Sequence, residues 1–585
     1  MQLKRKWPIG ILFVLLLGLL SCGKDHIIYV DSDADDSDDY IENTTFDHTV
    51  TVAFSTSGPA TVSGTTSDFT VSVSGNDVTI EYKGGDNVQY ELSGTTTNGF
   101  FKLYSYHKQA VVLNGVNITN PNGAAISLQG PSSSPSVGRK NFVVLNGSNM
   151  LADGISYTDT PSNEDEKAAL FAEGQLIFSG DGSLTVTATG KSGIASDSYV
   201  RFMSGVTVSV TSSAGHGIKG DEYLLVSGGT LNVETSADMK KGLNSDGFVR
   251  IDGGNITIKV TGGTAYDSED QDYTGTAGVK ADGDFVMNGG VLTITNSGTG
   301  GKGISSDGAG YFNGGTVNVT TTGSNYGSSV SGGGPGGGPS SSGNSVSAKG
   351  IKCEGDILFS GSNVSVNCNA HEGIESKGAI IVSSGHIYSY SASDDAINSA
   401  GNFLISGGYV CGYATSNDGL DANGNFYING GVVYAIGSSS PEVALDANTE
   451  GGYKLYVQGG TIIAIGGLEN GFSANQSCYS ASSWSTNTWY ALTVGSTTYA
   501  FKTPSSAGSP LVVSGSSTPT LLSAVSASGG SSYFNGMMLV DASVSGGTSI
   551  SLSSYSGGGS GGGPGGGSGG GPGGGPGGPG GGPGW

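Results

Sequence analysis

Two neighbouring stretches of the chain, AINSAGNFLISGG (396–408) and GLDANGNFYINGG (419–431), are nearly alike and decide the fold. Each has a small residue, an apolar residue, a polar turn, a short run of alternating apolar residues and a Gly-Gly pair. Alternation with a period of two is typical of a strand with one buried face, and glycine pairs supply the positive φ that bends need. The unit therefore predicts short strands joined by tight turns.

The small residue that opens this unit recurs along most of the chain, usually at steps of 23 to 25 residues. Its copies are Ala169, Gly193, Gly217, Gly242, Gly278, Gly303, Gly350, Gly373, Ala396, Gly419 and Ala444. Two longer steps carry insertions, at 263–276 and around 324–346. Short strands repeating at this length are typical of a solenoid whose coils stack about 4.8 Å apart. We predict an all-β chain that forms a right-handed parallel β-helix.

The extent of the repeat predicts the domain organisation. The β-helix is expected at 111–471. Segments 46–110 and 472–555 lack the repeat and are expected to be β-rich caps, because an open β-helix end would expose apolar core and strand edges. The insertion at 324–346 and the tail at 556–585 are rich in Gly, Pro and Ser, so both are expected to be flexible.

The first residues predict the compartment. A positive start is followed by an apolar run, 9–20, that is too short to span a bilayer and is typical of a secretion signal. The run ends in Leu-Leu-Ser-Cys, which resembles a bacterial lipobox. We therefore expect 1–21 to be a lipoprotein signal peptide and Cys22 to be lipidated, with the acyl chains as the only membrane contact. Residues 22–45 are expected to be an acidic linker.

This linker resembles the acidic stretch of surface-exported lipoproteins, which implies an outer-membrane protein at the cell surface; a periplasm-facing lipoprotein is the alternative. The formal net charge of −24 and a pI near 4.4 argue against nucleic acid and anionic membrane as partners. We expect a monomer.

A fixed repeat places equivalent residues in columns along the axis. In the middle coils, the columns beside the core position carry Lys219, Lys241, Lys280, Lys302, Lys349 and Lys352, and a nearby column carries carboxylates from Asp197 to Glu354. Lysines and carboxylates can neutralise each other as ladders. The alternative is a basic strip for the carboxylates of a substrate, formed by Lys280, Lys302, Lys349 and Lys352.

In the later coils, acidic residues replace these lysines. Two carboxylates about 5 Å apart repel by roughly 3 kcal/mol at an effective dielectric constant near 20, so such a stack needs a bound cation or raised pKa values. Oxygen ligands without a Cys-His pattern favour calcium over zinc. The predicted calcium ligands are Glu372, Glu375, Asp394, Asp395, Asn398, Asn417, Asp418, Asp421 and Asp446. Solvated surface charge is the alternative.

The signatures at 372–375, 394–398 and 418–421 resemble those of a known family, the pectate-lyase-like carbohydrate-binding β-helix proteins first recognised in cellulolytic clostridia. The resemblance covers about 111–467 and includes the acidic loop before Ala168-Ala169-Leu170. It implies calcium ions held between coils and binding of cellulose or pectic, polygalacturonate-type polymers. The calcium motif is similar to that of pectate lyases, which add a lysine base.

Three functions stay open. We favour calcium-dependent binding of an acidic or plant-type polysaccharide, in which Tyr409 and Tyr427 are further candidate contacts. A calcium-dependent polysaccharide lyase needs a base within reach, and the nearest lysine, Lys377, lies on a different column from the acids. The third function is that of a structural or adhesive surface protein.

Overall fold

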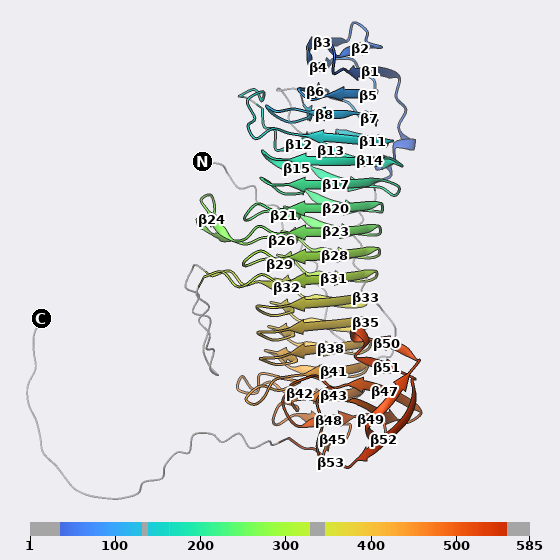
Figure 1. The fold of residues 1–585 in the computed structure, drawn as a ribbon, viewed down its shortest axis with the longest axis vertical. Coiled ribbons are helices and arrows are strands. Elements are labelled where there is room, and N and C mark those ends of the chain that lie inside the picture. The colour runs from blue at the N-terminus through green and yellow to red at the C-terminus, as the bar shows by residue number, and fades with distance from the viewer. Residues whose placement is uncertain (1–35, 131–138, 163, 328–344, 558–585) are drawn as a thin grey trace, which may run out of the picture.

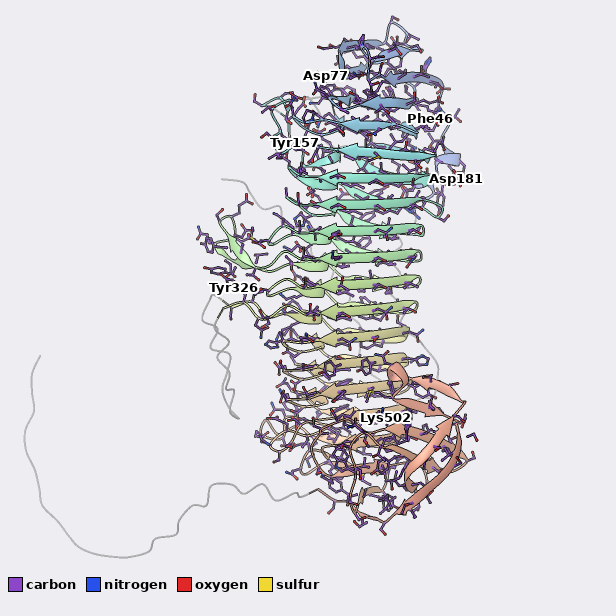
Figure 2. All side chains as sticks on the ribbon, viewed as in Figure 1. Phe46, Asp77, Tyr157, Asp181, Tyr326 and Lys502 are labelled. Atoms are coloured by element: carbon purple, nitrogen blue, oxygen red, sulfur yellow. The ribbon has the colours of Figure 1, made fainter. Side chains whose placement is uncertain are left out.

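The computed structural model describes residues 36–130, 139–162, 164–327 and 345–557. The expected signal peptide, Cys22 and its lipidation, most of the Gly/Pro/Ser insertion and nearly all of the tail lie outside these residues. Asp77 and Lys502, labelled in Figure 2, lie toward opposite ends of one elongated body. No helix of the described residues has the length and apolar character needed to cross a membrane.

The body is a stack of short strands in which each strand pairs in parallel with its counterparts in the coils before and after it (Figure 1). Strands of the first ladder are β7 (Gln109–Asn114), β10 (Lys140–Asn146), β13 (Gln175–Gly180), β16 (Tyr199–Phe202), β19 (Tyr223–Val226), β22 (Phe248–Ile251), β27 (Phe285–Met287), β30 (Gly310–Phe312), the first parts of β33 (Ile357–Cys368) and β35 (Ile380–Ser391), β37 (Phe403–Ile405), β40 (Phe426–Ile428) and β42 (Leu455–Val457).

The second ladder follows the first after a tight bend, which is a Gly-Gly pair in about half of the coils. It comprises β8 (Asn117–Thr119), β11 (Ser148–Ala152), β14 (Ser183–Ala188), β17 (Thr207–Ser212), β20 (Thr230–Thr235), β23 (Asn255–Val260), β28 (Val291–Asn296), β31 (Thr316–Thr321), the second parts of β33 and β35, β38 (Tyr409–Ala414), β41 (Val432–Ile436) and β43 (Thr461–Ile465). The second glycine of each Gly-Gly pair has a positive φ, for example 83° at Gly229 and 80° at Gly431, as the sequence predicts.

The third ladder is a separate sheet and carries the repeat glycine. It contains β4 (Asn76–Tyr82), β6 (Gly99–Tyr104), β9 (Ile126–Gln129), β12 (Ala168–Ala172), β15 (Ser192–Ser196), β18 (Ile218–Gly220), β21 (Lys241–Ser245), β26 (Ala277–Ala281), β29 (Lys302–Ser306), β32 (Lys349–Cys353), β34 (Ile374–Ser376), β36 (Ile397–Ser399) and β39 (Leu420–Ala422). The all-β prediction is confirmed, and parallel pairing dominates the two large sheets.

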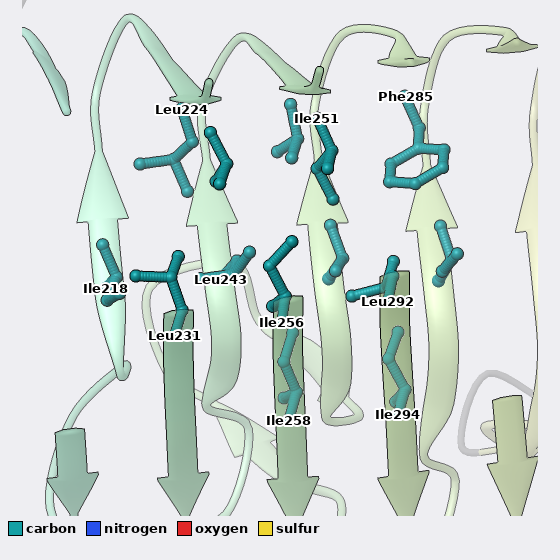
Figure 3. Close-up of a cluster of buried hydrophobic side chains, with 14 of the residues drawn as sticks. Ile218, Leu224, Leu231, Leu243, Ile251, Ile256, Ile258, Phe285, Leu292 and Ile294 are labelled. Carbon is teal, nitrogen blue, oxygen red and sulfur yellow. The ribbon is translucent and has the colours of Figure 1, made fainter. Parts of the chain in front are cut away.

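One continuous core fills the space between the ladders. Residues such as Ile218, Leu231 and Leu243 are fully buried, and Figure 3 shows their counterparts repeating from coil to coil. The repeat glycine is explained by crowding: a Cβ atom at Gly217 would lie 2.2 Å from Cγ1 of Val233, on β20 of the same repeat unit, and 2.6 Å from the carbonyl oxygen of Gly242 in the next unit. Apolar burial stabilises a fold by about 25 cal/mol per Å², so this stack provides the main stabilisation.

Parallel pairing begins earlier than the expected boundary at residue 111. Strand β1 (His48–Phe54) pairs in parallel with β5 (Val88–Thr96), and β5 pairs in parallel with β7. The segment expected to be an N-terminal cap therefore continues the stack. Its antiparallel additions are β2 (Thr61–Ser63) on β1 and β3 (Phe69–Ser74) on β4.

The C-terminal segment closes the other end with antiparallel strands. Strand β44 (Ser473–Ala474) still pairs in parallel with β42, and then β45 (Cys478–Ala481), β48 (Leu511–Ser514) and β53 (Leu552–Ser554) pair in antiparallel fashion. A six-stranded antiparallel sheet, here called the C-terminal sheet, packs on the last coils; it contains β46 (Trp489–Val494), β47 (Thr497–Lys502), β49 (Thr520–Ser528), β50 (Ser531–Tyr533), β51 (Met538–Val540) and β52 (Ser543–Ile550). The insertion at 263–276 forms a projecting hairpin of β24 (Ala265–Asp267) and β25 (Asp272–Thr274) (Figure 1).

The end of the segment expected to be an acidic linker, at 22–45, packs against the body. Residues 36–43 form two short 3-10 turns, η2 (Ser37–Asp39) and η3 (Ile41–Asn43). Asp39 is 1% exposed and accepts a hydrogen bond of 2.9 Å from Nη1 of Arg201; it also pairs with Lys140. A buried basic pair on the first ladder thus holds this segment against the body.

Candidate functional site

The acidic residues of the later coils lie in register on the outer side of the third ladder. Glu375 of β34 aligns with Asn398 of β36, which aligns with Asp421 of β39. Parallel bridges from Leu420 to Leu445 and from Leu445 to Leu468 continue the stack by two coils. Alternation places these leucines in the core, so the residue after each leucine faces outward. The column predicted from the repeat is therefore present.

The first half of the predicted calcium site is neutralised by the protein's own cations. Nζ of Lys349 lies 3.0 Å from Oε2 of Glu372 and also pairs with Glu375. The second oxygen of Glu375 accepts a hydrogen bond from Lys377. These side chains form a compact ion-pair cluster in which the two glutamates are only 6% and 2% exposed.

His371 completes this ion-pair cluster. Its Nδ1 pairs with Glu372 and lies 2.8 Å from Oδ2 of Asp394. Burial disfavours the imidazolium, but the hydrogen bonds to the two carboxylates outweigh it and raise the pKa of His371 to about 9. Burial likewise opposes ionisation of Glu372 and Asp394, yet the bond to His371 holds the pKa of each below its ordinary value. His371, Glu372 and Asp394 offer three ligand atoms within 4.8 Å of one another, but each is already paired.

The second half of the predicted site has a different character. Asp395, Asp418, Asp421, Asp446 and Glu469, here called the acid row, form no ion pair with a Lys, Arg or His of the described chain. Asp395 and Asp418 are only 5% and 8% exposed. Oδ1 of Asp395 accepts a hydrogen bond of 3.1 Å from the amide of Asp418, and Oδ1 of Asp418 accepts one of 2.6 Å from the amide of Val443.

Burial and mutual repulsion disfavour ionisation of the carboxyl groups in the acid row. Burial, reinforced by neighbouring carboxylates, raises the pKa of Asp395, Asp418 and Asp421 well above the ordinary value. Burial and a hydrogen bond to Asp446 raise the pKa of Glu469 to about 7. Calcium prefers carboxylate ligands, but no three ligand atoms of the acid row lie within 4.8 Å of one another in the part of the chain that the structure describes. Of the residues predicted as ligands, the acid row is therefore the part that lacks a cationic partner.

The two predicted asparagine ligands belong to different parts. Nδ2 of Asn398 donates a hydrogen bond of 3.0 Å to Asp395, so Asn398 contacts the acid row. Nδ2 of Asn417 donates one of 2.8 Å to Asp394 and so supports the ion-pair cluster. Glu469 was missed by the sequence prediction, although Gly467-Leu468-Glu469 follows the repeat position Ala444 by 23 residues and continues the column.

The lysines predicted to bind substrate are mostly engaged in ladders. Nζ of Lys280 lies 3.0 Å from Asp282 and also pairs with Asp307, and Lys352 pairs with Glu354. Lys349 is 7% exposed in the ion-pair cluster and does not fit a glycan contact. Lys302 has no ion pair in the part of the chain that the structure describes; burial and the charges of Lys352 and Lys349 lower its pKa to about 7. The geometry favours mutual neutralisation over a basic strip.

The two predicted tyrosine contacts differ in access. The ring of Tyr409 stacks on Tyr533 of the C-terminal sheet at 4.0 Å and 8°, so the sheet covers the face where a sugar would stack; as a glycan contact it does not fit. Tyr427 stacks on Tyr456 at 4.9 Å and 7° on the first ladder and stays partly exposed. Lys377, the candidate base of a lyase, donates to Glu375 of the ion-pair cluster, away from the acid row.

The comparisons with known proteins address the family. A search of curated proteins found no match. Among solved structures, the polysaccharide lyase-like protein from C. thermocellum, in a gadolinium derivative, has 20% sequence identity and a TM-score of 0.33, covering 53% of this chain and 96% of that chain. The model of a family described as carbohydrate-binding domain-containing protein matches residues 74–259, 238–327 and 298–396, which overlap and together span more than half of the 585 residues. This chain therefore belongs to the family of carbohydrate-binding domain-containing proteins.

Proposed function

We propose that this protein binds an acidic, plant-type polysaccharide such as polygalacturonate in a calcium-dependent manner at the bacterial cell surface. The observation that carries the proposal is the acid row, whose partly buried carboxylates have no cationic partner in the described chain. Membership of a carbohydrate-binding family supports a polysaccharide as the partner. Surface attachment would come from lipidated Cys22, as the sequence of the N-terminus predicts.

The acid row would hold calcium chiefly through Asp395, Asp418 and Asp421, with Asp446 and Glu469 extending the set. A bound calcium ion would supply positive charge to which the carboxylate of a uronate residue can add as a further ligand. This matters because the protein carries a net charge of −24 and would otherwise repel an acidic polymer. With calcium bound, the carboxylates of the row would be ionised and would hold the ion in place.

We further propose that the coils wind as a right-handed parallel β-helix. Crossover connections between parallel strands of one sheet are right-handed in about 98% of cases, for reasons of strand twist. Such a scaffold places successive carboxylates about 4.8 Å apart along the axis, which suits an extended chain that spans several coils.

The test is binding of polygalacturonate measured with calcium and with EDTA. The wild-type protein should retain the polymer only with calcium, and the double variant Asp395→Asn/Asp418→Asn should behave with calcium as the wild type does in EDTA. Asp307→Asn is a matched control, because this outward carboxylate pairs with Lys280 and lies outside the acid row. Full polymer binding in EDTA, or full calcium-dependent binding by the double variant, would refute the proposal.

A further inference from the structure

A cleft of about 300 Å³ lies where the C-terminal sheet meets the outer face of the second ladder. Strands β31, β33 and β35 form one wall. The other wall is the turn between β50 and β51, which includes the 3-10 turn η4 (Phe534–Gly536). Figure 1 shows β50 and β51 beside the lower coils. The cleft is on a different ladder from the acid row, so the two are separate sites.

The lining of the cleft is polar and uncharged apart from one histidine. None of the residues that line it is a Lys, Arg, Asp or Glu. Burial lowers the pKa of His386, so this side chain is neutral at pH 7. An acidic ligand would find no positive charge in the lining, and a basic ligand would find no negative charge.

Open hydrogen-bonding groups stand on the ladder wall. The side-chain amides of Asn318 and Asn363 form no hydrogen bond with the described protein. On the opposite wall, Asn535 is exposed and makes one weak bond of 3.4 Å, to Oγ of Ser365. Each free amide offers donors and an acceptor, the pairing that sugar hydroxyl groups require.

Aromatic rings stand beside these amides. Tyr533 stacks on Tyr409, and the ring of His386 meets both of them edge to face, with its centroid 4.9 Å from that of Tyr533. Tyr388 and Phe534 add buried apolar surface to the lining. A cleft of this size with aromatic side chains and a few placed polar groups is typical of a small-ligand site.

We propose that this cleft binds an uncharged sugar residue of a polysaccharide chain. The apolar face of the pyranose ring lies against the aromatic side chains, and its hydroxyl groups bond to Asn318, Asn363 and Asn535. This is a second carbohydrate site, independent of calcium, and it goes beyond the acidic polymer assigned to the acid row.

The outer face of the second ladder offers the polymer a path away from the cleft. One register row on this face consists of Ser209, Asn232, Thr257, Thr293, Asn318 and Ser365. All six residues are uncharged and hydrogen-bonding. A neutral chain that leaves the cleft can therefore follow the axis over several coils without meeting a charge in this row.

Isothermal titration in EDTA tests the cleft with three neutral probes: cellohexaose, xylohexaose and mannohexaose. At least one should bind the wild-type protein, and Asn363→Ala and Asn535→Gly should each weaken that binding at least tenfold. Both residues are exposed, and glycine suits the φ of 54° at Asn535, so these variants should fold. Asn429→Ala, an exposed asparagine that follows β40 on the first ladder, is the matched control and should stay within twofold of the wild type.

Three outcomes would overturn the inference: no binding of any neutral probe, full binding by both cleft variants, or binding of hexagalacturonate in EDTA that the cleft variants abolish. The Asp395→Asn/Asp418→Asn variant separates the two sites. It should bind the neutral probe as the wild type does, whether or not the acid row binds polygalacturonate.

Discussion

Replacing Glu469 with glutamine should stabilise the calcium-free protein at pH 8. In the folded protein, burial and Asp446 raise the pKa of Glu469 from 4.5 to about 7, so folding favours the protonated form. The protonated Glu469 carboxyl group therefore contributes its full stabilisation at low pH, and this contribution is lost as the pH rises through about 7. Glutamine cannot ionise; it can accept the 2.9 Å hydrogen bond from Oγ1 of Thr449 and donate to Asp446.

The pKa values set the size of the effect. A difference of about 2.5 pH units at 1.36 kcal/mol per unit gives about 3 kcal/mol at pH 8. Glu469 is only partly buried, and solvent screening reduces the gain to about 1–2 kcal/mol. A gain of that size slows local opening about 5- to 30-fold.

Hydrogen exchange of the peptide 461–474, followed by mass spectrometry in EDTA, measures this opening locally. Glu469→Gln should slow exchange of the peptide at pH 8, and the ratio to the wild type should shrink toward one at pH 5. Glu234→Gln is the control, because Glu234 is an exposed partner of Lys259 at 2.7 Å and lies on an earlier coil. Unchanged or faster exchange of Glu469→Gln at pH 8 would refute the assigned repulsion in the acid row.

Three further predictions follow from the same geometry. Burial and repulsion raise the pKa values of Asp395, Asp418 and Asp421, so the calcium-free protein should lose thermal stability as the pH rises from 5 to 8. Calcium should raise the unfolding temperature more at pH 8 than at pH 5, and an equal rise at both pH values would contradict a calcium site in the acid row. Lys349→Met should lower the free energy of unfolding in urea by about 3 kcal/mol; this is the low end for breaking a buried pair, because His371 and Lys377 still neutralise the glutamates. The control Lys352→Ala should lower it by less than about 1 kcal/mol, and equal losses in the two variants would count against the ion-pair cluster. Polygalacturonate incubated with calcium at alkaline pH should give no ultraviolet-absorbing unsaturated product, because the ammonium of Lys377 donates to Glu375; product formation that Lys377→Ala abolishes would establish a lyase.

The repeat made much of the fold predictable from the sequence. A constant step of 23 to 25 residues forces equivalent positions to stack, so Ile397 and Leu420 could be assigned to the core and Asn398 and Asp421 to the outward column. The same rule extends to Glu469, which a further step along the repeat would have included. Local alternation and glycine pairs carry this information because they act between neighbouring residues and neighbouring coils.

Tertiary structure alone decided which carboxylates already have partners. Asp394 and Asp395 are adjacent in sequence, yet Asp394 pairs with His371 while Asp395 aligns with the acid row, because side chains of adjacent residues point in different directions. Contacts between segments that no repeat relates were equally hidden: Tyr533 covers Tyr409, and Asp39 is buried against Arg201. Such pairings depend on how a cap or a terminal segment folds back onto the stack, and periodicity within the stack contains no information about that path.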